Sequence, residues 1–254
     1  MAATTTTEST TPPRRPVMQR DLAMRLAATE YERFADLLDR LTSDEWRQPT
    51  ECPGWDVRAI AGHAYGMARM SASLLEMRRQ LAVAKRSPGV FIDALTAHQV
   101  EKFSTLDNET LASAYRATGV KAARARARTP SLARNLTMKP AQAVGGVDEW
   151  WTLGYLVDVI FTRDPWMHRV DICRATGETM VLTAEHDGAL VADVVDEWAR
   201  RHGRPIDLTL TGPAGGRWRT GSGAQPVEMD AVEFCRVLSG RAPGTGLLAV
   251  QVPF

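Results

Sequence analysis

Two histidines of this chain, His63 and His168, have the surroundings that a functional imidazole needs. The sequence holds 5 histidines, at positions 63, 98, 168, 186 and 202. His63 falls in a predicted helix over residues 57–84, on one stripe with the apolar residues Ile60, Met67, Met70 and Leu74. It therefore points into the protein, where an imidazole is either a core residue with a hydrogen-bond partner or a metal ligand. By itself, this pattern favours the core residue.

His168 favours the metal ligand, because a carboxylate precedes it by one helical turn. Asp164 and His168 are four residues apart in the sequence, so their side chains leave a helix on the same face. Two ligands from one helix turn and a third, His63, from a neighbouring helix make an open metal site in a helical bundle. Two imidazoles and one carboxylate leave a position for water or a thiolate, which suits catalysis.

Asp164 also has a purely structural interpretation. Because Pro165 follows it, Asp164 can be the N-cap of a helix whose first turn contains the proline, and its carboxylate then serves backbone N–H groups. Asp171, three residues after His168, can orient that imidazole or pair with a neighbouring arginine. The spacing alone leaves these alternatives open.

Other groups that could carry chemistry have plainer interpretations. Cys52 is interpreted as a small buried apolar residue rather than a nucleophile or ligand. The basic run over residues 121–128 is interpreted as a solvated helix surface, with a patch for an anionic thiol cofactor as the alternative. Three tryptophans are expected to fill the core: Trp150, Trp151 and Trp166. The sequence has no glycine-rich phosphate-binding motif, so nothing supports nucleotide binding.

The elements that must position these residues are mainly helical up to Gly177. Apolar periodicity predicts helices over residues 20–41, 57–84, 90–103 and 108–128. Residues 129–148 contain two prolines and two glycines and are expected to form a loop. An apolar stretch from residue 150 to residue 161 leads into the segment with Asp164 and His168, and Gly177 is expected to end that helix.

The pattern changes after Gly177 to that of a small α+β unit. A helix over residues 183–202 is followed by a hairpin, with one strand over 206–211, a glycine-rich turn and a second strand around Trp218. A helix over 231–238 and a final strand over 247–252 complete the unit. We therefore predict a disordered tail over residues 1–17, a helical bundle over 18–177 and an α+β domain over 178–254.

The composition excludes several classes of protein. With 31 Lys+Arg against 30 Asp+Glu, the net charge of +1 gives no basic face for nucleic acid. A 44% hydrophobic content is too high for a wholly disordered chain, and no 18-residue apolar run predicts a membrane span. The 3 widely spaced cysteines indicate no disulfide framework, and no secretory signal is evident, so the expected location is the cytoplasm. The oligomeric state is left open.

Two segments of the chain resemble the mycothiol-dependent maleylpyruvate isomerase family. They are residues 52–58 (CPGWDVR), followed by His63, and residues 167–171 (MHRVD). The family belongs to the DinB-like four-helix bundles, so the resemblance implies a mainly α fold with a small sterol-carrier-like α+β domain after the bundle. It also implies that His63, Asp164 and His168 bind a divalent metal, usually zinc, and that mycothiol is the thiol cosubstrate.

The same resemblance points to an arginine of the C-terminal domain. In the family such an arginine assists at the active site, and Arg241 is the first candidate here, with Arg217 the second. From the sequence alone, the interpretation favoured for both is a solvated loop arginine. The family's glutamate ligand is replaced by Asp164, which is one methylene shorter and precedes a proline, and this departure puts the inherited substrate in question more than the metal.

The resulting hypothesis is an enzyme in which a metal activates a low-molecular-weight thiol against a small electrophilic substrate, with acidic substrates included. Isomerisation, S-transfer and conjugate hydrolysis all fit this hypothesis. One alternative is a thiol-independent metal hydrolase, with water at the open position. The other is a non-catalytic bundle that binds a ligand or senses one for a regulator.

Overall fold

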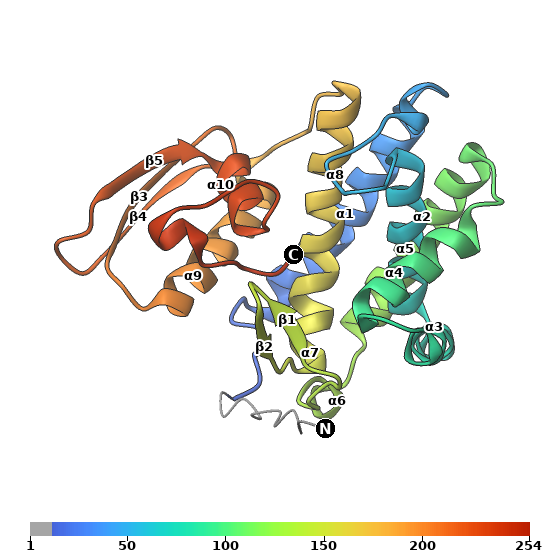
Figure 1. Cartoon of the computed structure of the whole chain (residues 1–254), viewed down its shortest axis with the longest axis horizontal. Coiled ribbons are helices and arrows are strands. Elements are labelled where there is room, and N and C mark those ends of the chain that lie inside the picture. Colours follow the sequence, from blue (N-terminus) through green and yellow to red (C-terminus); the bar gives the residue numbers. More distant parts are fainter. Residues whose placement is uncertain (1–11) are drawn as a thin grey trace, which may run out of the picture.

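Four long helices form a bundle that holds both predicted histidines. The computed structural model describes residues 12–254. In it, α1 packs on α5 and α8, and α2 packs on the same two helices, as Figure 1 shows. The bounds of the four are Arg20–Arg40 (α1), Val57–Ala72 (α2), Asn108–Ala127 (α5) and Phe161–Thr176 (α8). Their apolar stripes meet in one core cluster that includes Phe34, Ile60, Leu111 and Ile172. The predicted bundle is therefore confirmed.

Two further helices cover the outer side of α2. These are α3 (Leu74–Arg86) and α4 (Phe91–Phe103), which pack on each other and on α2. The single helix predicted over residues 57–84 is wrong, because Ser73 divides it. Ser73 has extended backbone angles, and its hydroxyl accepts a hydrogen bond from the N–H of Glu76 at 3.3 Å, so it ends α2 and caps α3. Leu74, which we expected on the inner stripe, is consequently exposed.

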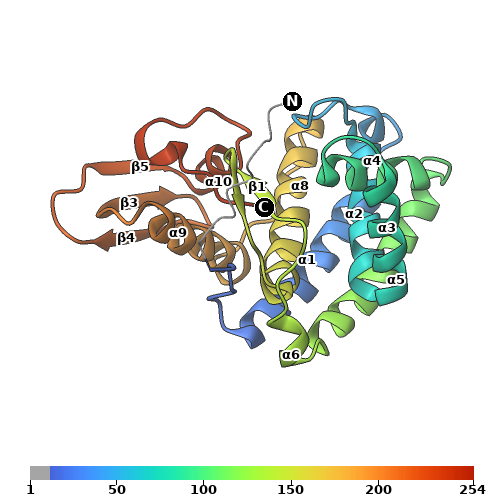
Figure 2. The same cartoon turned by 60° about the horizontal axis from the view of Figure 1, so that its bottom comes forward.

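The loop predicted over residues 129–148 contains regular structure instead. It holds the short helix α6 (Ser131–Arg134) and an antiparallel hairpin of β1 (Gln142–Val144) and β2 (Val147–Glu149). The turn consists of Gly145 and Gly146, both at positive φ, a conformation that glycine adopts without a steric penalty. Figure 2 shows the hairpin lying between α8 and the C-terminal part of the chain.

The segment after Gly177 forms the expected α+β arrangement with one change. Strand β3 (Ile206–Thr211) is central, with β4 (Gly216–Thr220) antiparallel on one side and β5 (Pro226–Asp230) parallel on the other. Helices α9 (Ala189–His202) and α10 (Ala231–Leu238) contribute to the core cluster beside this sheet. The final strand predicted over 247–252 is wrong: Gly246–Ala249 is a 3-10 turn, and the chain beyond it bonds to α10 through Val252 N–H and Leu238 O.

Buried charges join α8 to the C-terminal part. The Arg163 guanidinium lies 2.6 Å from Asp193 and 2.8 Å from Glu197, both on α9. Trp166 and Val170 of α8 belong to the same core cluster as the sheet, so α8 is packed on both sides. The division of the chain at residues 177 and 178 stays a prediction.

The disordered tail predicted over residues 1–17 is only partly described by the structure, and the described part is held by hydrogen bonds. Residues 1–11 of the predicted tail lie outside the described residues. In the remainder, Arg14 N–H donates to Trp150 O at 2.8 Å, and Thr152 N–H donates to Arg14 O at 3.0 Å, which holds the segment against the start of the α8 region. No helix within residues 12–254 is long and apolar enough to cross a membrane.

Candidate metal centre

The helix that carries Asp164 and His168 follows an unusual course. It starts at Thr152 with the short helix α7 (Leu153–Tyr155), passes through a π-helical turn at Leu156–Ile160 and continues as α8. Asp164 and Pro165 therefore lie inside a helix, and the interpretation of Asp164 as an N-cap is wrong. Its carboxylate is left free for other partners.

A buried arginine makes this internal proline possible. Pro165 has no N–H, so the carbonyl of Phe161, four residues earlier, loses its usual helical donor. The Nη1 of Arg126 donates to that carbonyl at 2.9 Å, and its Nε donates to Val157 O at 2.8 Å. Arg126 is only 1% exposed, so the interpretation of residues 121–128 as a wholly solvated surface is wrong at this position.

The structure brings the three predicted ligands together. His63 Nε2 lies 3.3 Å from Asp164 Oδ1, and His168 Nε2 lies 3.6 Å from the same oxygen. One donor atom from each of the three residues lies within 4.8 Å of the other two. Tetrahedral zinc with ligands at about 2.0–2.1 Å places its ligand atoms roughly 3.3 Å apart, so these spacings fit a bound zinc ion.

The hydrogen-bond partners of His63 decide which of its nitrogens faces Asp164 in the cluster of His63, Asp164 and His168. The Nε2 amide group of Gln80 donates to the carbonyl of Gly66 at 3.2 Å, and this fixes the orientation of the Gln80 amide. Its Oε1 then accepts from Gln99 Nε2 at 2.8 Å, so Gln99 Oε1 faces His63 Nδ1 at 2.7 Å. Because a carbonyl oxygen only accepts, Nδ1 carries a proton, and Nε2 is the nitrogen that faces Asp164 and would bind a metal in the neutral ring.

His168 is held in the same tautomer by Asp171. Its Nδ1 lies 2.8 Å from Asp171 Oδ2, a carboxylate that can only accept. Burial works to raise the pKa of Asp171, but hydrogen bonds from His168 and Arg241 outweigh it and hold that pKa far below its usual range. Asp171 therefore orients the imidazole, one of the two roles that the sequence left open.

Arg241 anchors that carboxylate from the C-terminal part of the chain. Its Nε donates to Asp171 Oδ1 at 2.6 Å and its Nη2 to Oδ2 at 2.7 Å, a bidentate pair. The side chain also lines the cavity next to the three ligands. Arg217, the second candidate, is 68% exposed on β4, lies 3.7 Å from Asp207 and does not line this cavity.

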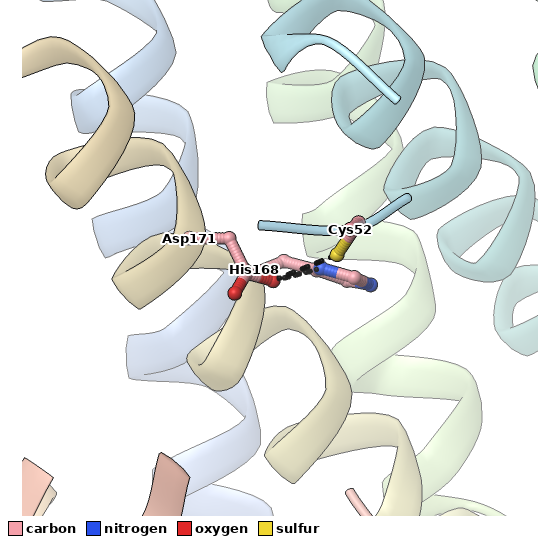
Figure 3. A group of neighbouring side chains, drawn as sticks. All are labelled: Cys52, His168 and Asp171. Atoms are coloured by element: carbon pink, nitrogen blue, oxygen red, sulfur yellow. Dashed lines mark hydrogen bonds and ion pairs between the residues drawn. The ribbon is translucent and has the colours of Figure 1, made fainter. Parts of the chain in front are cut away.

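Cys52 has a polar role that the sequence interpretation missed. Figure 3 shows its side chain beside His168 and Asp171, and its thiol donates to Asp171 Oδ2 at 3.3 Å. Cys52, His168 and Asp171 also fall within metal-ligand spacing of each other. However, burial and the neighbouring Asp171 charge raise the pKa of Cys52 to about 12, and Asp171 is already paired with Arg241. The thiol therefore keeps its proton and acts as a donor.

Asp164 is suited to receive a cation. Its Oδ2 is buried without a hydrogen-bond partner in the part of the chain that the structure describes. Burial works to raise the pKa of Asp164, but the neighbouring His63 and His168 outweigh this and lower it, so the group is an anion. Two imidazole Nε2 atoms and a carboxylate oxygen converge here, and a proton or a metal ion among them relieves the repulsion between their lone pairs. The donor set fits a divalent metal.

A cavity of about 370 Å³ opens beside the cluster. Trp55 covers the imidazoles on one side, with its ring centroid 5.2 Å from that of His63 and 6.2 Å from that of His168. The walls come from α2, α4, the β1–β2 hairpin and the last residues of the chain. A small molecule in this cavity would lie against all three proposed ligands.

Comparison with known proteins places the bundle in a family. The model of the mycothiol maleylpyruvate isomerase N-terminal domain matches residues 27–173. The chain belongs to this family. The matched region contains His63, Asp164 and His168, whereas Arg241 lies beyond it, and no curated protein sequence matches the chain.

Two solved structures share the fold of nearly the whole chain. One is the crystal structure of the mycothiol-dependent maleylpyruvate isomerase, with a TM-score of 0.58. The other is a histidine-to-alanine mutant of a mycothiol-dependent maleylpyruvate isomerase, with a TM-score of 0.55. Each is 16% identical in sequence, and the match covers 89% of this chain and 90% of the other. The mainly α fold with its appended α+β unit is thereby confirmed for this family member.

Sequence reasoning missed the two buried glutamines. Gln99 and Gln80 are 0% exposed and form the hydrogen-bonded link behind His63. The sequence pattern could have predicted that Gln99 is buried. It lies four residues from Leu95 and four from Phe103, which are both buried on the inner face of α4. A glutamine on an apolar stripe needs partners, and His63 on the adjacent helix was available.

Proposed function

We propose that this chain is a metal-dependent and mycothiol-dependent enzyme, an isomerase or S-transferase acting on a small electrophile. In this proposal His63, Asp164 and His168 hold the metal, with zinc the first choice for this donor set. One observation carries it: both imidazoles turn Nε2 towards the same Asp164 oxygen, with their Nδ1 atoms fixed by Gln99 and Asp171. Membership of the isomerase family supports the use of the thiol.

The residues around the cluster each have a part in this proposal. A bound divalent metal would lower the pKa of a thiol so that the thiolate is available at neutral pH. Trp55 shields the imidazoles, and the apolar cavity excludes water from the nucleophile. Arg241 is a positioning residue that fixes Asp171 and through it His168; we propose that residues 178–254 form the unit that supplies it.

The chemistry that follows is addition of a thiolate to an electrophilic carbon. In an isomerisation, the sulfur forms a bond to one carbon of a double bond, and the electron pair moves to a conjugated carbonyl oxygen. Rotation about the resulting single bond and expulsion of the thiolate restore the double bond with changed geometry. In an S-transfer, the neighbouring carbon takes a proton from solvent instead, and the sulfur stays bound.

Metal analysis of the purified protein tests the ligand assignment. We expect about one zinc per chain in the native protein, and loss of that zinc in both His63→Ala and His168→Ala. His98→Ala is the matched control, because His98 lies on α4 and does not line the cavity. Zinc retained at one per chain in His168→Ala would refute the site.

The thiol dependence is tested separately with the zinc-loaded protein. We expect the consumption of an electrophilic enone to rise with mycothiol concentration and to saturate, above the uncatalysed rate. Equal turnover without the thiol would identify the hydrolase alternative. A protein without metal and without turnover would support the non-catalytic ligand-binding alternative and overturn the proposal.

A further inference from the structure

The cavity beside His63, Asp164 and His168 has predominantly apolar walls. Its side chains include Met67, Met70, Leu95, Trp151, Ile160 and Phe161. Its volume of about 370 Å³ is more than twice that of the roughly 150 Å³ apolar cavity that holds one benzene molecule. Methionines adapt to ligands of different shapes, because their unbranched side chains change rotamer easily. The cavity therefore accommodates an apolar body larger than a single aromatic ring.

The charges that face the cavity are already matched. Among the described residues, Arg241 is the only arginine or lysine that lines it, and its Nε and Nη2 are both committed to Asp171 at 2.6 and 2.7 Å. Asp164 would be neutralised by the bound metal, and the metal's remaining positive charge by the thiolate. Arg241 Nη1 remains open, but Asp171 already balances the charge of this guanidinium, so a second carboxylate would enter the apolar site without an unpaired cation, which is costly.

Uncharged polar groups remain for recognition. The hydroxyls of Thr96 and Ser239 donate to backbone carbonyls and can still accept, and Gln142 Nε2, which donates to Pro140 O, has a second hydrogen to give. Such groups bind a carbonyl or hydroxyl without requiring a charge. The lining therefore suits a molecule with an apolar body and one or two neutral polar atoms.

We propose that this enzyme takes a neutral, predominantly apolar electrophile, such as an aryl or alkyl enone, in preference to a small carboxylic acid. The inference rests on the proposed thiol chemistry and specifies its substrate class. In the step considered, the thiolate sulfur bonds to the β-carbon of the enone, and the electron pair of the double bond moves to the carbonyl oxygen. The α-carbon then takes one proton from solvent, which balances the proton that the thiol has lost.

A matched pair of enones tests the substrate class. The neutral probe is 4-phenylbut-3-en-2-one, and the acidic probe is the same molecule with a carboxylate at the para position of the ring. Each kcat/KM, measured with mycothiol and the zinc-loaded enzyme, is divided by the uncatalysed rate of the same probe. We expect the neutral enone to be favoured at least tenfold; equal values or a preference for the acid would overturn the inference.

A variant at the cavity wall checks that charge is the cause. Ile92 lines the cavity and is 44% exposed, so it can be replaced without opening the core. Ile92→Lys should reduce the preference for the neutral enone to about threefold or less, because it supplies the missing cation. Ile92→Gln, polar but uncharged, should leave the preference unchanged; an equal effect of both variants would refute the electrostatic cause.

Binding of unreactive analogues separates this inference from the proposed function. The saturated ketones of the two probes cannot react, and Trp55 and Trp151 in the lining report their binding by fluorescence. If neither enone is consumed above the uncatalysed rate, the proposed function fails. The substrate class is then decided by the two Kd values: at least tenfold weaker binding of the carboxylate supports it, and equal binding overturns it.

Discussion

Replacement of Gln99 tests whether the glutamine pair behind His63 positions a metal ligand. In Gln99→Met the side chain keeps its length and stays among the sulfur atoms of Met67 and Met70, but it can no longer accept from His63. His63 Nδ1 and Gln80 Oε1 both lose their buried partner. Each orphaned group costs about 1–3 kcal/mol, so we expect a loss of roughly 2–6 kcal/mol in unfolding free energy.

The effect on the metal is separate from the effect on stability. Without its acceptor, the His63 ring can rotate and can move its proton to Nε2, which removes the lone pair that faces Asp164. Loss of a partner behind a metal-binding histidine lowers metal affinity by about 10–100-fold. Zinc affinity is measured by competition with a chromogenic chelator, and unfolding free energy by chemical denaturation of the metal-free protein.

Gln80→Met is the matched control for this prediction. It removes the donors to Gly66 O and Glu76 Oε1 and leaves Gln99 Nε2 only the sulfur atoms of Met67 and Met70 as acceptors, yet it keeps the Gln99–His63 bond in place. We expect a comparable loss of stability but less than a threefold loss of zinc affinity. If Gln99→Met bound zinc as tightly as the native protein, or if both variants weakened zinc equally, the positioning role would be refuted.

Three further outcomes follow from the contacts around the cluster. Gly66→Ala should weaken zinc binding by about tenfold in the same chelator assay, because its Cβ would lie 2.5 Å from Gln99 Cγ and displace that side chain. Arg126→Met should lower the unfolding free energy by about 2 kcal/mol or more, since Phe161 O loses its donor, whereas exposed Arg124→Met should change it by less than about 0.5 kcal/mol. Asp171→Asn should have a lower unfolding free energy than the native protein at pH 7. Because folding lowers the pKa of Asp171, this difference is complete above about pH 4 and shrinks as the pH falls below it. Chemical denaturation at several pH values measures it.

The sequence alone determined which residues could form the site and which elements carry them. The spacing of Asp164 and His168 and the inward position of His63 indicated three ligands on two helices, and all three side chains meet in the structure. Amphipathic periodicity also predicted α1, α4, α5, α9 and α10 closely, because these helices bury one face and expose the other. Family resemblance directed attention to Arg241, which the structure places beside Asp171.

Only the tertiary structure decided how Asp164 is used. From the local sequence, Asp before Pro165 reads as a helix start, and the donor that lets the helix continue is Arg126, 35 residues before Phe161 in the chain. Local patterns carry no information on such a pairing, because it depends on how α5 packs against α8. The same holds for Cys52 and Asp171, which are 119 residues apart.

The sequence alone likewise could not predict which nitrogen of each imidazole faces Asp164. A histidine on an apolar stripe is the same pattern whether its Nε2 carries a proton or a lone pair. The difference arises from Gln99 on α4 and Asp171 on α8, whose oxygens face the two Nδ1 atoms only after the helices have packed. Residue types and spacing therefore determined the candidate donor set, and packing decided that one atom of each member converges on one point.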